Sequence, residues 1–151
     1  MVIPLHRRLG DAAATLALGQ ELAQHLAPGS LLLLVGDLGA GKTCLVQGLA
    51  AGLGISEPIT SPTFALAQHY QGATGRALVH LDLYRLEQPA AADELLAQEE
   101  EEAQALGAVL AVEWPERLSE LPQEAWQLRL DLVDAADPEA GRLAWITPPP
   151  A

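Results

Sequence analysis

The spacing of hydrophobic positions divides the chain into helical and extended segments. Apolar residues at helical spacing predict a helix over residues 12–26, and helices are also expected over 44–50 and 90–106. Apolar runs of strand length predict strands over residues 31–35, 64–70, 77–84, 108–112, 127–132 and 142–146. Asp11 can cap the start of the first helix, and Pro28 with Gly29 ends it.

The connections between these segments indicate how the strands pair. A glycine-containing turn at 71–75 joins two predicted strands, so we expect an antiparallel hairpin there. The last two strands form a closing pair across residues 134–138. Elsewhere strands and helices alternate, which favours an α/β fold with a mostly parallel central sheet and flanking helices. We expect one domain over residues 1–147 and a loose proline-rich tail at 148–151.

Residues 36–43 lie between a predicted buried strand and a predicted helix and read GDLGAGKT. They fit the phosphate-binding pattern G-x-x-x-x-G-K-[ST] at every fixed position. Glycines let backbone N–H groups close around phosphate oxygens, and the helix start adds its unpaired N–H groups. We expect Lys42 to reach the outer phosphates and the Thr43 hydroxyl to hold Mg²⁺. The candidate nucleotide-binding residues here are Gly36, Asp37, Leu38, Gly39, Ala40, Gly41, Lys42, Thr43 and Cys44.

Such a loop indicates a P-loop NTPase-like three-layer domain, which needs a carboxylate at the end of a buried strand to position Mg²⁺. Glu113 follows an uninterrupted apolar run, whereas Asp82 follows a run that His80 interrupts. The pattern therefore favours Glu113 as the metal ligand beside Thr43 and leaves Asp82 to orient or activate the attacking water. The alternative for each carboxylate is a capping or pairing role at a strand end. We expect His80 to pack within its strand rather than act as a base.

Other polar residues near these motifs leave alternatives open. Thr60, Ser61 and Thr63 lie where related hydrolases carry a loop that closes over the terminal phosphate, or they form an ordinary turn. Arg85 and Arg117 either contact phosphate or form surface ion pairs.

Composition limits the partners and the compartment. The 151 residues include 8 Lys and Arg against 20 Asp and Glu, a net charge of −12 that should repel nucleic acid over most of the surface. We therefore expect any role near RNA to be indirect, through a partner. The only cysteine, Cys44, excludes an internal disulfide and is expected to be an ordinary helix residue. No apolar run approaches the roughly 20 residues of a membrane span, and the first residues lack a secretory signal, so we expect a cytoplasmic protein.

Two absences narrow the function. A guanine-reading N/T-K-x-D segment is impossible because the chain has no asparagine and its only lysine is in the loop, so ATP is favoured. Small-molecule kinases of this fold carry several arginines that clamp phosphates, and this chain has few basic residues to do so. A small kinase and a nucleotide-gated module without hydrolysis remain the alternatives to an ATPase.

With these segments assembled, the sequence closely resembles the bacterial TsaE family. The matching segments are TLALG at 15–19, the loop at 36–43, SPTF at 61–64, HLDLYRL at 80–86 and EWPE at 113–116. The last three, in this order, are more specific than the loop alone.

That family is the ATPase component of the machinery that makes threonylcarbamoyladenosine in tRNA. The resemblance implies ATP hydrolysis that is weak alone and rises in complex with TsaB and TsaD, the second being the transferase. Carried over by position, Thr43 and Glu113 would bind Mg²⁺, and Asp82 would serve hydrolysis. Thr15 would lie near the base or ribose, and Trp114 either beside the metal site or in the core.

The chain departs from the family between residues 86 and 107. Where a Glu-Leu-Gly-like segment is expected, this chain has AAADELL at 90–96 and then four glutamates at 99–102. We interpret the glutamates as a solvated helix face rather than a docking patch.

Overall fold

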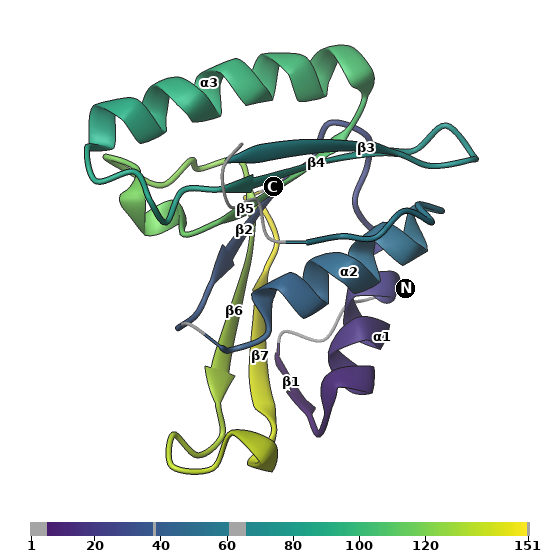
Figure 1. Cartoon of the computed structure of the whole chain (residues 1–151), viewed down its shortest axis with the longest axis vertical. Helices are drawn as coiled ribbons and strands as arrows, with labels where there is room; N and C mark the ends of the chain where they lie inside the picture. Colours follow the sequence, from purple (N-terminus) through teal and green to yellow (C-terminus); the bar gives the residue numbers. More distant parts are fainter. Residues whose placement is uncertain (1–5, 38, 61–65, 151) are drawn as a thin grey trace.

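The computed structural model describes residues 6–37, 39–60 and 66–150. Within them, seven strands form one sheet in the order β1-β7-β6-β2-β5-β4-β3 (Figure 1). The strands are β1 His6–Leu9, β2 Leu31–Val35, β3 Ala67–Gln71, β4 Ala77–Asp82, β5 Val109–Glu113, β6 Trp126–Leu132 and β7 Arg142–Thr147. The three α-helices are α1 Ala12–Ala23, α2 Lys42–Gly52 and α3 Pro89–Leu106.

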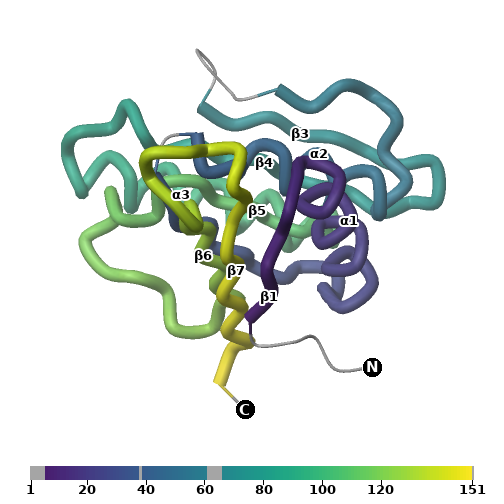
Figure 2. Tube along the Cα trace, turned by 90° about the horizontal axis from the view of Figure 1, so that it is seen from below, coloured from purple at the N-terminus to yellow at the C-terminus, as the bar shows by residue number. Residues whose placement is uncertain are grey.

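The centre of the sheet is parallel and both of its edges are antiparallel. Strands β6, β2, β5 and β4 run parallel to one another, as predicted for the core of an α/β fold. The predicted hairpin is confirmed as β3 paired with β4, and the predicted closing pair as β6 with β7. Strand β1 was not predicted; it pairs with β7 and extends the sheet beyond the closing pair (Figure 2).

Three layers result from packing helices on both faces of the sheet (Figure 1). Helices α1 and α2 cover one face, and α3 covers the other. Consecutive strand residues point to opposite faces, so Leu78 joins the core under α1 and α2, while Val79 joins the core under α3. The buried residues are mostly leucine, valine and alanine, as the scarcity of aromatic residues requires.

The first helix begins as predicted and ends earlier than predicted. The Asp11 carboxylate accepts a hydrogen bond from the backbone N–H of Ala14 at 2.8 Å, so the cap is confirmed. The helix stops at Ala23 because Gln24 donates to the carbonyl of Glu21, a tightened last turn. Leu26 remains buried in the core although it lies beyond the helix.

Two glycines allow α1 and α2 to pack closely. A Cβ atom at Gly48 would lie 2.2 Å from the carbonyl oxygen of Leu16, and one at Gly19 would lie 2.4 Å from that of Leu45. Only glycine leaves room for this approach of the two backbones. The contact fixes α1 beside α2 and hence Thr15 beside Gly41. Gly41 belongs to residues 36–43, the segment that fits the phosphate-binding pattern, hereafter the phosphate loop.

Helix α3 carries the four glutamates that begin at Glu99. Glu100, Glu101 and Glu102 are exposed, as expected for a solvated face. Glu99 is buried instead, and its carboxylate pairs with the imidazole of His69 on β3 at 3.1 Å. Among the helices of the described ranges, none combines the length and the apolar character needed to cross a membrane.

We predict that Gly48→Ala destabilises the protein by about 1–3 kcal/mol, the usual cost of overpacking. Helix propensity alone predicts the opposite sign, a gain of about 1 kcal/mol, so the sign of the change is informative. Gly10→Ala is the matched control, because nothing lies within 4 Å of a Cβ at Gly10. Urea unfolding measures both, and an unchanged or raised stability of Gly48→Ala would disprove the close contact.

Candidate functional site

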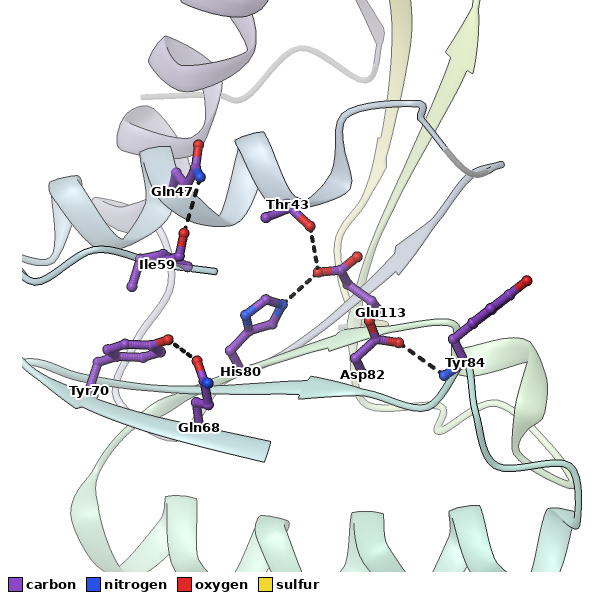
Figure 3. Close-up of polar contacts among 9 residues, drawn as sticks. All are labelled: Thr43, Gln47, Ile59, Gln68, Tyr70, His80, Asp82, Tyr84 and Glu113. Atoms are coloured by element: carbon purple, nitrogen blue, oxygen red, sulfur yellow. Dashed lines mark hydrogen bonds and ion pairs between the residues drawn. The ribbon is translucent and has the colours of Figure 1, made fainter. Parts of the chain in front are cut away.

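The candidate site lies where the carboxyl ends of β4 and β5 meet the start of α2 (Figure 3). The parallel register places Asp82 opposite Glu113 on the neighbouring strand. On its other side Glu113 lies opposite Leu34 of β2, the strand that leads into the phosphate loop. Both predicted carboxylates therefore lie at the carboxyl ends of the parallel strands, the same end from which the loop leaves β2, as expected for a parallel α/β site.

The phosphate loop brings Lys42 into a buried position at the first residue of α2. Gly41 precedes it with φ 103°, a left-handed conformation that glycine adopts at little cost. The Lys42 ammonium donates to the carbonyl of Gly36 and lies 3.6 Å from the centre of the Trp114 ring. Burial lowers the pKa of Lys42, and nearby carboxylates, Glu113 first among them, act in the opposite direction.

Glu113 is the centre of a buried polar cluster. Its Oε2 accepts a hydrogen bond from the Thr43 hydroxyl at 3.3 Å and lies 2.6 Å from Nε2 of His80 (Figure 3). Glu113 is 3% exposed and His80 is fully buried. His80 was expected to be a packed strand residue; it is packed, and it also holds the carboxylate of the predicted metal ligand.

Asp82 is half-buried and points into the same region. Its Oδ1 accepts a hydrogen bond from the backbone N–H of Tyr84 at 2.9 Å. Burial raises the pKa of Asp82; the Tyr84 N–H bond opposes this rise and the Glu113 carboxylate adds to it. A carboxyl with a raised pKa accepts a proton more readily, which suits a group that orients or activates water.

Two adjoining cavities surround the loop. One, of about 340 Å³, is lined by Lys42, Thr43, Asp82, Glu113 and Trp114, among others. The second, of about 470 Å³, lies beside α1 and the turn before β7, and its lining includes Thr15, Ala40, Glu139 and Arg142. Gly41 and Cys44 line both cavities.

Most of the predicted site residues come together around these cavities. Gly36 contacts Lys42, and Asp37 is exposed and accepts from the backbone N–H of Ala40 at 3.0 Å. Predicted positions outside the described residues are Leu38, Ser61 and Thr63.

Thr60, Arg85 and Arg117 are the remaining polar residues for which the sequence left two roles open. Thr60 and Arg85 are exposed. Arg117 lies over the ring of Tyr84, 5.4 Å from its centre.

Two contacts beside the loop were not predicted from the sequence. The sequence showed His80 inside an apolar run, but only the strand register reveals its contact with Glu113. Arg142 was overlooked because it is 102 positions from Ala40, the loop residue to which it donates. No local pattern signals a contact of that kind.

The chain offers few protein ligands for a metal at this site. No group of three or more His, Cys, Asp or Glu side chains suited to hold a metal occurs in the described part of the chain. Mg²⁺ is commonly bound through one or two carboxylates together with substrate phosphates and waters. The meeting of the Thr43 hydroxyl with the Glu113 carboxylate fits that donor set.

Comparisons with known proteins agree on one family. The family model described as "Threonylcarbamoyl adenosine biosynthesis protein TsaE" matches residues 9–140. A relative from Nostoc sp. named tRNA threonylcarbamoyladenosine biosynthesis protein TsaE is 45% identical over 93% of this chain and 83% of its own length. The protein of that name from Synechocystis sp. is 50% identical over 77% and 73%. The crystal structure of Bacillus subtilis YdiB matches with a TM-score of 0.73 at 31% identity, covering 97% of this chain and 87% of that one.

We predict that at a given pH the Cys44 thiol reacts more slowly with iodoacetamide in the folded chain than in the unfolded chain. Burial raises the pKa of this thiol, and the charge of Arg142 opposes the rise. At a given pH the folded chain then holds less reactive thiolate than the unfolded chain. Because Cys44 is the only cysteine, the alkylation rate measured against pH, with and without urea, reports this site alone. A midpoint at or below that of the unfolded chain would contradict the raised pKa that partial burial gives the thiol.

Proposed function

This chain belongs to the TsaE family, and we propose that it is a magnesium-dependent ATPase that supports threonylcarbamoyl transfer to adenosine of tRNA. TsaE family proteins take part in tRNA threonylcarbamoyladenosine biosynthesis. The observation that carries the proposal is the convergence of Lys42, Thr43, Asp82 and Glu113 on one cavity beside the phosphate loop. These are the groups that binding and hydrolysis of a nucleoside triphosphate require.

In this proposal the nucleotide lies across both cavities. The triphosphate occupies the smaller cavity, where Lys42 and the first N–H groups of α2 meet negative charge. The ribose and base extend past Gly41 and Cys44 into the larger cavity, beside Thr15. Close packing of α1 on α2 holds Thr15 there, which explains how a residue of α1 joins the site.

Hydrolysis is attack of water on the γ-phosphate with departure of ADP. Lys42 and the loop amides stabilise the charge on the transferring phosphoryl group. Asp82, held by the Tyr84 N–H, orients the water and accepts its hydrogen bond. The buried position of Lys42 strengthens its effect because little solvent screens the charge.

Thr43 and Glu113 are the residues that would hold Mg²⁺, which when bound neutralises charge on the phosphates and orients them. Their side chains already meet at 3.3 Å. His80 fixes the Glu113 carboxylate from the side away from α2 (Figure 3). Such outer partners orient metal ligands.

The proposed partners are the TsaB and TsaD homologues, which raise a weak basal activity. The acidic net charge of −12 favours contact with tRNA only indirectly, through that complex. We place this activity in the cytoplasm.

We predict slow phosphate release from Mg-ATP by the purified chain and a faster rate when TsaB and TsaD are added. Lys42→Ala should lower both rates by roughly 100-fold or more, because one preorganised charge-stabilising donor is lost. Arg129→Ala removes an exposed cation and serves as the control. Near-normal hydrolysis by Lys42→Ala would refute the loop assignment.

The same assay distinguishes the two alternative functions. ADP formation only with an added metabolite would indicate a kinase. Tight ATP binding without turnover beside the partners would indicate a gated binding module.

The two carboxylates should respond differently to magnesium. Glu113→Ala should raise the Mg²⁺ concentration needed for half-maximal hydrolysis more than Asp82→Ala does, because Glu113 would hold the metal. Asp82→Ala should mainly lower the maximal rate. Titration of activity with Mg²⁺ at saturating ATP separates the two effects, and the reverse order would exchange the two roles.

A further inference from the structure

Arg142, the first residue of β7, connects the C-terminal strands to the phosphate loop. Its guanidinium donates to the carbonyls of Gly39 at 3.1 Å and Ala40 at 2.9 Å. The same guanidinium donates to the carbonyls of Pro138 and Gly141 in the turn between β6 and β7. One planar side chain therefore joins two segments that are far apart in the sequence.

All four of these acceptors of the Arg142 guanidinium are backbone carbonyl oxygens. In the described ranges of the chain, no carboxylate lies within ion-pair distance of Arg142. Arginine presents five N–H donors in a rigid fork, which suits several carbonyls at once better than the single ammonium of lysine. The arrangement points to a positioning role rather than to a surface ion pair.

The geometry of a phosphate-binding loop explains why such a donor is useful. In a trans peptide the C=O and N–H groups point in opposite directions. A loop that turns N–H groups toward a phosphate therefore turns the preceding carbonyls outward. Holding the carbonyl of Ala40 fixes the direction of the N–H of Gly41, which lines both cavities.

We propose that Arg142 is a positioning residue that holds the phosphate loop in its nucleotide-binding shape and so makes nucleotide affinity depend on the β6–β7 turn. This inference rests on the nucleotide binding proposed above. Arg142 lies beyond the residues 9–140 that match the family model, and its role comes from this structure alone.

The test compares Arg142→Lys and Arg142→Met with the matched pair Arg129→Lys and Arg129→Met. Arg129 lies on the adjacent strand β6, and its side chain is 64% exposed. We expect both Arg142 variants to lose roughly tenfold or more in ADP affinity, measured by titration calorimetry, and both Arg129 variants to stay within about twofold. Lysine keeps the charge but not the fork, so Arg142→Lys separates geometry from electrostatic attraction.

A second readout needs no nucleotide. The N–H of Ala40 donates to Asp37, and that of Leu45 donates to Gly41, both at the loop. Hydrogen exchange of these two amides should accelerate in the Arg142 variants, while amides of β2 keep their wild-type rates. General destabilisation would instead accelerate exchange throughout the sheet.

Three outcomes would overturn the inference: wild-type ADP affinity in Arg142→Lys, unchanged exchange of the loop amides, or acceleration spread evenly over the protein. If the wild-type chain binds no nucleotide, the proposed function fails. The exchange rates then still decide whether Arg142 holds the loop, so the two failures remain distinct.

Discussion

The parallel pairing of β4 with β5 is the constraint on which the site depends. Its register puts Asp82 and Glu113 opposite each other at the end of two buried strands. Shifting either strand by one residue would turn its carboxylate to the opposite face of the sheet. The apolar residues of β5 enter the two cores in alternation. A slip by one residue would carry Glu113 to the face under α3 and away from His80 and Thr43, so the cost of burying that carboxylate without its partners disfavours the shifted register.

The buried charges at the site compensate one another only in part. Burial disfavours the charged form of Lys42 and of Asp82, as the directions of their pKa shifts show. Trp114, Gly36 and the neighbouring carboxylates surround Lys42 and offset part of that cost. Burial of these charged groups lowers the stability of the folded protein, and packing in the rest of the fold offsets that loss. Perturbed pKa values of this kind are typical of functional sites.

Local patterns in the sequence predicted the central strands, the three helices and the TsaE family, which the comparisons confirm. They failed where long-range contacts decide the structure. Strand β1 is short and polar, and forms because β7 offers it an edge. Glu99 is buried because the hairpin brings His69 to α3. His80 and Arg142 reach the site through strand register and the β6–β7 turn, which no local pattern encodes.

The electrostatics of the site bear on which form of nucleotide it would accept. Lys42 is the only lysine, and four carboxylates act on it, those of Glu113, Glu116, Asp82 and Asp37. A bare triphosphate would bring further negative charge into a site that already has an excess of it. A triphosphate that carries Mg²⁺ brings its own compensating charge, and Glu113 then becomes an attractive ligand instead of a repulsive neighbour. On this physical ground the metal-bound nucleotide is the form that the proposed ATPase would select.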